Sequence, residues 1–421
     1  MVRSSFFIFG FAAILASASV ATASDAGPSD CSHMEAWDYA TGMCMPLAMP
    51  GMPMTMVMVH GSSFFNQTFE EGARGQNAFA VPNMLMTDIG QSVGDHQYIN
   101  LDFMGTIEKW SFPKAGYPEL LQIGEQRDDG SPFIDDQHPH SSPIMGLTLS
   151  DTISFGVGKN HAKVWFAPRG ESTDGPVAFM HRATGVVNPD APLGHHIGQD
   201  VGHISSTVVG ASIFVGDTTI EASSFNGTEP DPMKVDLPIG ALNSYAARLT
   251  EQFSRHFYAM ASAAFVKSPD PNEPDLDHLW RYSASIYGET QIDEGWSLSE
   301  TLIWGLINNF DHSSSLNSFA DEFLLRKDAC SFWGRLEILQ RTPSELAVIN
   351  TDDMNRGRWV TAATFGYTHR LAEWGDAELG LGGSLTKDFL PPEFESAYGG
   401  DPLTAKIFLH LSGAKMWHIV E

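Results

Sequence analysis

The chain has 421 residues, of which 51 are Asp or Glu and 24 are Lys or Arg, so its formal charge is −27. Hydrophobic residues make up 43% of the chain and charged residues 18%, which is too apolar a composition for a disordered protein. The acidic balance excludes nucleic acid as an expected partner, because neutralising phosphates requires a surface rich in Lys and Arg.

The first 23 residues have the features of a secretory signal peptide. Arg3 gives a basic start, an apolar run covers residues 6–20, and the tripeptide Ala-Thr-Ala at 21–23 is a small-residue cleavage site. We therefore predict export, with cleavage after Ala23. A membrane anchor is the competing interpretation, but the run is short for a membrane span. Because no later stretch approaches 18 apolar residues, an exported chain of this kind can enter a membrane only as a β-barrel.

Residues 24–60 form a segment that is rich in sulfur and imidazole and contains eight of the 18 methionines. Thioether sulfur is a soft, neutral ligand that suits Cu(I) or Ag(I) better than Zn²⁺, Mg²⁺ or Ca²⁺. Methionines at every second position of an extended chain also project from one face. We predict a flexible arm that binds Cu(I), with silver as a second soft ion. Its expected ligands are Met43, Met45, Met49, Met52, Met54, Met56, Met58, His33 and Cys44. The alternative is that these methionines serve as adaptable packing.

The pattern between residues 61 and 140 is weak, with Gly, Pro and polar residues between short apolar pieces. Residues 128–142 have the composition of a long exposed loop. His138 and His140 lie in this stretch beside Asp135 and Asp136. We expect these two histidines to be solvated.

From residue 144 onward, apolar and polar residues alternate with the period of two that is typical of strands. The candidate strands are residues 152–158, 161–167, 204–215, 218–226, 241–251, 255–267, 278–290, 295–308, 316–326, 329–341, 357–371, 374–387 and 402–411. Many exceed the usual length of about 5–6 residues, and short turns alternate with long acidic loops such as 268–277. This pattern predicts an all-β fold: an antiparallel transmembrane β-barrel of about 12–16 strands over residues 61–421. Residues 417–421 are expected to trail beyond the last strand.

A second candidate metal site lies in the stretch between residues 178 and 203, which contains four histidines and two aspartates. Imidazole binds Cu, Zn and Ni, and a neighbouring carboxylate can orient the ring. The residues concerned are His181, His195, His196 and His203, with Asp190 and Asp200 beside them. The Pro and Gly content places them in a loop, and an inward-folded loop would constrict a barrel. Structural hydrogen bonding by the same residues is an equally weighted alternative.

Two runs of sequence carry a resemblance to known proteins. Residues 178–196 contain Phe-Met-His-Arg and Asn-Pro-Asp-Ala-Pro-Leu-Gly-His-His, followed by His203-Ile204, and residues 225–231 read Phe-Asn-Gly-Thr-Glu-Pro-Asp. Through them the chain resembles a group of predicted outer-membrane β-barrel proteins of Gram-negative bacteria associated with heavy-metal handling, over roughly residues 60–412. The resemblance implies a barrel in the cell envelope, without catalytic residues. The methionine-rich arm is also similar in composition and order to that of outer-membrane copper-resistance proteins.

Together these features predict an outer-membrane barrel that contacts lipid and binds metal ions. The expected function is copper or silver tolerance: the arm captures Cu(I), and the barrel sequesters or exports it, with periplasmic copper proteins as further partners. A general pore for small solutes and a soluble periplasmic all-β metal-binding protein are the alternatives. The common motifs of hydrolases, metalloproteases and nucleotide-binding enzymes are missing, so we do not expect an enzyme.

Overall fold

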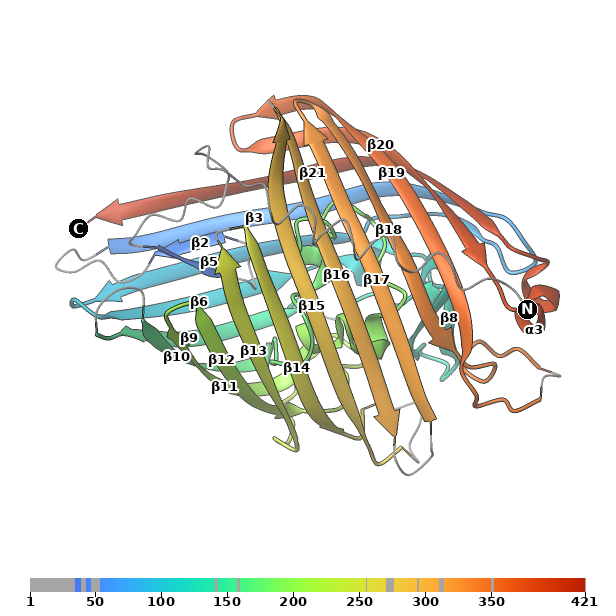
Figure 1. Ribbon diagram of the computed structural model, residues 1–421, viewed down its shortest axis with the longest axis horizontal. Coiled ribbons are helices and arrows are strands. Elements are labelled where there is room, and N and C mark those ends of the chain that lie inside the picture. Colours follow the sequence, from blue (N-terminus) through green and yellow to red (C-terminus); the bar gives the residue numbers. More distant parts are fainter. Residues whose placement is uncertain are drawn as a thin grey trace. The chain divides into compact units, whose positions relative to one another are not determined.

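The computed structural model describes residues 35–38, 43–46, 54–140, 143–156, 160–254, 256–269, 276–293, 295–309, 314–349 and 352–420. A closed antiparallel barrel of 16 strands dominates this part of the chain, and strands that are adjacent in the sequence are also adjacent in the wall (Figure 1). The predicted transmembrane barrel fold is thereby confirmed. None of the helices in these ranges is both long enough and apolar enough to span a membrane.

The wall begins with β3 (Met54–Glu70), which pairs with β4 (Asn77–Ala80) and then with β5 (Asn83–Val93), so that β4 and β5 form one interrupted strand. The other wall strands are β6 (Gln97–Gly105), β9 (Gly146–Ser154), β10 (His161–Gly170), β11 (Ser205–Val215), β12 (Thr218–Asn226), β13 (Ser244–Ser254), β14 (Phe257–Lys267), β15 (His278–Asp293), β16 (Trp296–Asn309), β17 (Ser314–Lys327), β18 (Cys330–Arg341), β19 (Arg358–Trp374), β20 (Ala377–Phe389) and β21 (Leu403–Val420). Pairing of β21 with β3 closes the barrel.

The remaining elements are short. They are β1 (Glu35–Asp38), β2 (Met43–Pro46), α2 (Glu108–Ser111), β7 (Tyr117–Gln126), β8 (Pro132–Gln137), α3 (Pro392–Tyr398) and the helical turns η1 (Phe179–His181), η2 (His195–Gln199) and η3 (Val201–His203). β1 pairs with β2, and β7 pairs with β8, each as a two-stranded sheet that is not part of the barrel wall.

The two faces of the wall differ in chemistry. On β21, Ile407 and Leu409 are exposed on the outer surface, whereas Lys406 and Phe408, which alternate with them, are buried in the lumen. The same alternation recurs around the barrel, and the exposed positions are mostly Leu, Ile, Val and Phe. A water-soluble protein rarely exposes contiguous apolar surface on this scale. The outer surface therefore fits the hydrocarbon of a bilayer, which favours the membrane barrel over the soluble alternative.

The connections also differ between the two rims. Short turns such as Gly216-Asp217 and Gly375-Asp376 lie at one rim, together with the paired barrel ends Met54 and Val420. At the other rim the strands are joined by longer connections. The five longest are residues 106–145, 171–204, 227–243, 342–357 and 390–402. This asymmetry is the arrangement of bacterial transmembrane barrels.

Most of the strands predicted after residue 144 lie within a few residues of those in the structure, but two expectations closer to the termini are wrong. β3 begins at Met54, so residues 54–60 belong to the wall and not to a flexible arm. The weakly patterned region belongs to the barrel, as predicted, and contains β4, β5 and β6. Its alternation is hidden where lumen-facing Met84 and Met86 flank lipid-facing Leu85. Residues 417–420 continue β21, whose partner is β3 at the other end of the chain.

Replacing Leu249 by Arg tests the lipid-facing surface. Leu249 lies at the middle of β13, is 47% exposed and pairs with Ile220, which is also exposed. We expect Leu249→Arg to lower the free energy of unfolding from lipid vesicles by about 2–4 kcal/mol, the cost of Arg near a bilayer midplane. The matched control is Leu242→Arg, because Leu242 is similarly exposed but lies in the connection before β13. Equal losses in the two variants would contradict a bilayer around β13.

Candidate functional site

The connection of residues 171–204 folds into the lumen and is held there by charged groups of the wall; we call it the inward loop. Arg182 of this loop donates to both carboxylate oxygens of Glu322 on β17, at 2.7 and 3.0 Å. Arg335 on β18 donates to the same carboxylate at 3.0 Å. All three side chains are buried. Removing one partner of a buried ion pair costs about 3–5 kcal/mol, so this triad fixes the loop to the wall.

The turn that contains His195 and His196 is fixed by the wall on both sides. The backbone N–H of Leu193 donates to Glu337 at 2.6 Å, and the Ser318 hydroxyl donates to the carbonyl of Ile197 at 2.7 Å. The wall approaches so closely here that a Cβ atom on Gly305 would lie 1.9 Å from that same carbonyl oxygen. Any residue other than glycine at this wall position would displace the loop.

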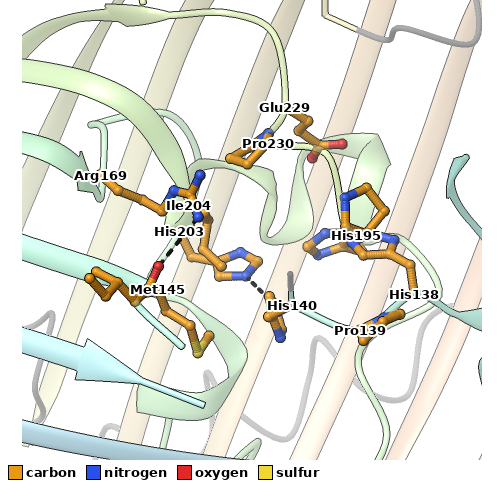
Figure 2. Close-up of a pocket in the computed structure, with 12 residues that line it drawn as sticks. His138, Pro139, His140, Met145, Arg169, His195, His203, Ile204, Glu229 and Pro230 are labelled. Atoms are coloured by element: carbon orange, nitrogen blue, oxygen red, sulfur yellow. Dashed lines mark hydrogen bonds between the residues drawn. The ribbon is translucent and has the colours of Figure 1, made fainter. Parts of the chain in front are cut away.

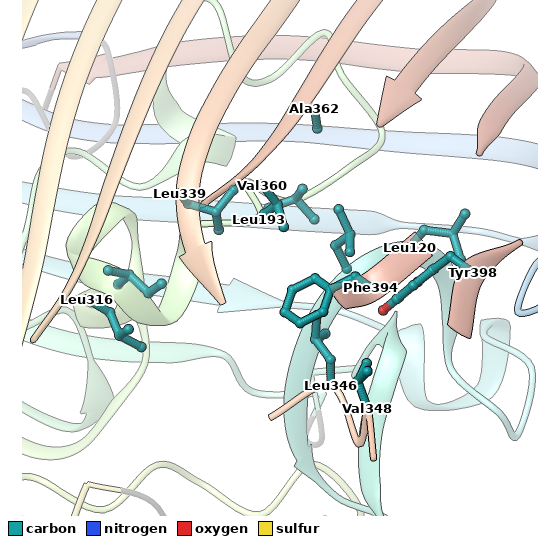
Figure 3. Close-up of a cluster of buried hydrophobic side chains, with 12 residues drawn as sticks. Leu120, Leu193, Leu316, Leu339, Leu346, Val348, Val360, Ala362, Phe394 and Tyr398 are labelled. Carbon is teal, nitrogen blue, oxygen red and sulfur yellow. The ribbon is translucent and has the colours of Figure 1, made fainter. Parts of the chain in front are cut away.

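An apolar cluster joins the inward loop to three of the other four long connections (Figure 3). The residues drawn in Figure 3 come from β7, from the inward loop, from the wall and from the connections on either side of β19 and β20. The buried members are Leu120, Leu121, Leu193, Ile197, Leu316, Leu339, Leu346, Val348, Val360, Ala362, Phe394 and Tyr398. Burial of one large apolar side chain contributes about 1.5–3 kcal/mol, so the cluster binds these connections into one layer inside the barrel.

Five imidazoles gather where the inward loop meets the residues that directly follow β8. They are His138, His140, His195, His196 and His203, and we call them the histidine cluster. Figure 2 shows His138, His140, His195 and His203. The rings of His195 and His196 are 4.6 Å apart between centroids, and those of His195 and His203 are 5.2 Å apart. The Nε2 atoms of His140 and His203 lie 3.1 Å from each other. A pocket lined by His138, His140, His195 and His203, with Glu229 beside them, adjoins the cluster.

Carboxylates complete two groups of potential metal ligands within this cluster. One ligand atom each from His195, Asp200 and His203 lie within 4.8 Å of one another, and the same holds for His195, His196 and Glu229. His195 is common to both groups. Imidazole with carboxylate is a donor set for Zn²⁺, Cu²⁺ or Ni²⁺.

Two histidines and the aspartate of these ligand groups are held in the forms that suit metal binding. Burial lowers the pKa of His196 to about 3 and that of His203 to about 4, so both rings are neutral at pH 7. Burial alone would raise the pKa of Asp200, but His203 and His195 outweigh it and hold that pKa below the usual value. Neutral imidazole and ionised carboxylate are the forms that ligate metals.

Several buried polar atoms of the cluster lack a good hydrogen-bond partner among the described residues. The Nε2 of His196 has none, and the Nδ1 of His195 and one carboxylate oxygen of Asp200 have only each other, at 3.5 Å, which is long for a hydrogen bond. Leaving a polar atom buried and unpaired costs about 1–3 kcal/mol, and natural structures rarely tolerate it without a reason. A cation held between these atoms would satisfy them, so the residues present fit a bound transition-metal ion.

The structure brings together three of the four histidines predicted in residues 178–203. His195, His196 and His203 join the cluster, whereas His181 lies 3.5 Å from Glu171 and belongs to neither ligand group. His138 and His140 were expected to be solvated, and this expectation is wrong. Residues 128–142 are not a long exposed loop either, because β8 lies within them and much of the stretch is buried. The sequence carries no signal for this inward placement.

The predicted ligands of the methionine-rich segment are only partly described. His33, Met49 and Met52 lie outside the described residues, and Met43, Cys44, Met45 and Met54 are described as backbone in β2 and β3. Met56 and Met58 are buried on the luminal face of β3. Metal binding by this segment stays a prediction.

No family model and no curated protein sequence matches this chain. Solved structures do match. The chain is similar to OprB of Pseudomonas putida in its high-pH structure, with a TM-score of 0.52 and 9% identity over 86% of this chain and 94% of that one. Weaker likenesses are the anion-selective porin from Comamonas acidovorans (TM-score 0.49, 10% identity, 85% and 99% covered) and the outer-membrane channel DcaP of Acinetobacter baumannii (0.48, 10%, 86% and 96%). The likeness to OprB shows a porin-like fold.

A histidine variant tests the metal site. We expect His195→Ala to weaken Zn²⁺ binding by more than about tenfold, because His195 belongs to both ligand groups and even the loss of a supporting partner costs 10–100-fold. The measurement is calorimetric titration of the detergent-solubilised full chain, with the bound metal counted by mass spectrometry. The control is His181→Ala, whose ring lies outside both groups. Unchanged binding in His195→Ala would remove the cluster as a metal site.

Proposed function

We propose that the protein is a channel of the outer membrane of a Gram-negative bacterium, with a lumen that is constricted by the inward loop and that binds transition-metal ions at the constriction. One observation supports this most: a closed barrel with an apolar exterior encloses a clamped loop that carries buried imidazoles and carboxylates. Burying ionisable groups is costly, and such groups concentrate at functional sites. A general pore is therefore the better-supported interpretation, with the histidine cluster as its distinguishing feature.

The asymmetry of the rims suggests an orientation. In bacterial outer-membrane barrels, short turns face the periplasm and long loops face the exterior. On this basis Met54 and Val420 lie on the periplasmic side. The histidine cluster is built from long connections and so lies toward the external mouth. A solute that crosses the barrel then has to pass the inward loop.

A bound metal would also tie the constriction together. Glu229 belongs to the connection between β12 and β13, whereas His195 and His196 belong to the inward loop. An ion shared by these three residues would cross-link two connections that otherwise meet by packing. Occupancy of the site would in this way set how firmly the constriction is closed.

Copper or silver tolerance, the function expected from the methionine-rich segment, is a second candidate. It is favoured by Met56 and Met58, two of the expected ligands, whose buried side chains face the lumen and not the lipid. Thioether ligands in a channel lumen suit soft monovalent ions.

Release of the inward loop tests the constriction. Glu322→Gln leaves Arg182 and Arg335 with no full countercharge, a loss of about 3–5 kcal/mol for a buried ion pair. We expect larger and noisier single-channel conductance in planar bilayers and faster proteolysis within residues 171–204. The control is Glu221→Gln, which removes the 2.7 Å partner of Arg248 within the wall. A Glu322→Gln barrel that folds but conducts no better than the native chain would contradict the proposed constriction.

Removal of the arm tests copper capture separately. Deleting residues 31–53 leaves β3 intact, because this strand starts at Met54. We expect cells that produce the deleted form to lose copper tolerance relative to cells with the full chain, since Cu(I) capture would fall with the number of available thioethers. The measurement is growth against copper concentration, with equal barrel levels in the outer membrane. Unchanged tolerance would contradict capture by the arm without affecting the channel proposal.

A further inference from the structure

Two histidines of the cluster face each other through the same ring nitrogen. The Nε2 atoms of His140 and His203 lie 3.1 Å apart, and the dashed line between the two rings in Figure 2 marks this contact. His140 belongs to the connection of residues 106–145 and His203 to the inward loop, so the contact joins two connections. Both residues are buried, with 9% and 6% of their surface exposed. We call these two residues the facing pair.

The other ring nitrogen of His140 is occupied by Glu108 of α2. Oε2 of Glu108 accepts the backbone N–H of His140 at 3.1 Å and lies 2.5 Å from His140 Nδ1. The backbone N–H of Asn83 donates to the second carboxylate oxygen at 3.4 Å. An ionised carboxylate can only accept hydrogen bonds, so the hydrogen of the ring contact lies on Nδ1 of His140.

His203 repeats this arrangement with a backbone carbonyl. The carbonyl oxygen of Asp200 accepts the backbone N–H of His203 at 3.3 Å and lies 2.6 Å from His203 Nδ1. A carbonyl oxygen can only accept, so Nδ1 is again the nitrogen that carries the hydrogen. A neutral imidazole has a single N–H. In the neutral rings, both Nε2 atoms of the facing pair therefore present lone pairs.

Two lone pairs that face each other leave both acceptors unsatisfied unless a cation lies between them. A single proton can take this place, which makes one of the two rings a charged imidazolium. A metal ion is the other occupant. Two nitrogens that bind one zinc ion at about 2.0–2.1 Å and at a tetrahedral angle are about 3.3 Å apart. The observed separation of 3.1 Å is close to this value, so the pair is already spaced as two ligands of one ion.

The surroundings of the facing pair are those of metal-binding histidines. A histidine that ligates a metal donates its other N–H to a carboxylate or to a backbone carbonyl, which fixes both the tautomer and the orientation of the ring. Glu108 supplies the carboxylate for one ring, and Asp200 supplies the carbonyl for the other. Both members of the pair also line the pocket that adjoins the cluster. An ion between them can therefore take water or a solute from the pocket as a further ligand.

We propose that the facing pair holds a second divalent transition-metal ion between its two Nε2 atoms. Imidazole nitrogen suits Zn²⁺, Cu²⁺ and Ni²⁺. The inference rests on the proposed metal-binding constriction and adds to it a ligand, His140, and an orienting residue, Glu108, which belong to neither ligand group described above. The group that includes His196 and Glu229 keeps the first ion. Because the pair joins two connections, the second ion fastens the connection of residues 106–145 to the inward loop.

The test counts Zn²⁺ ions on the full chain in detergent, by calorimetric titration and by mass spectrometry. His140→Asn is the deciding variant, because the amide N–H of Asn can replace Nδ1–H as the donor to Glu108 while Nε2 is lost. We expect two Zn²⁺ per native chain and one per His140→Asn chain. The matched control is His181→Asn, which should keep both ions. His181 is as buried as His140, at 9% exposed, and lies outside the facing pair and both ligand groups.

Glu108→Gln tests the orienting role by a different readout. We expect this variant to keep two Zn²⁺ per chain, with one of them bound about 10–100-fold more weakly, the usual cost of losing such a partner. A merely structural role of Glu108 would weaken both ions alike, and that result would contradict the assignment of Glu108 to the second ion.

Comparison with His195→Ala separates this inference from the proposed function. Two ions in the native chain and in His181→Asn, with one in folded His140→Asn, support the second position. A single ion that survives His140→Asn but not His195→Ala overturns the second position and leaves the proposed site standing, with a shared proton only between the facing pair. Loss of an ion in His181→Asn as well as in His140→Asn also overturns it, because any buried histidine would then serve. A native chain without Zn²⁺ overturns both proposals.

Discussion

The organisation of the lumen depends on one buried carboxylate. Glu322 lies between the guanidinium groups of Arg182 and Arg335 and accepts hydrogen bonds from both. Moving such ions out of water costs several kcal/mol each, and only near-ideal pairing offsets that cost. The wall on its own would hold Glu322 and Arg335 as a pair; the inward loop contributes the third charge. The contacts that hold the inward loop in place are therefore the same contacts that pair the buried charges of the wall.

Other charged wall residues extend this principle to the rest of the inner layer. Arg281 on β15 pairs with Asp174 at 2.9 Å, and Lys406 on β21 pairs with Asp190, so strands from distant parts of the wall contact the same loop. Each strand consequently faces two environments, lipid outside and a charged, packed layer inside. The strands therefore carry aliphatic side chains on one face and ionisable side chains on the other. This is why the alternation in the sequence predicted the strands over most of the chain.

Alternation failed where the inner layer is itself apolar. Met84 and Met86 face the lumen on either side of lipid-facing Leu85, so three apolar residues stand in a row at the start of β5 and hide the period of two there. Only some of the clustered histidines could be predicted from the sequence, and the reason is different. His195, His196 and His203 are near neighbours in the chain, so their clustering was predictable. His140 reaches them only because the connection after β8 enters the lumen, a placement decided by contacts between residues far apart in sequence.

The lumen thus holds two donor sets that do not favour the same ion. The histidine cluster combines imidazole with carboxylate, which suits borderline divalent ions, whereas the buried thioethers of Met56 and Met58 offer neutral sulfur. A divalent ion held by anionic carboxylates is retained strongly, because charge attraction adds to ligation. A monovalent ion on neutral thioethers lacks that attraction and is held more weakly.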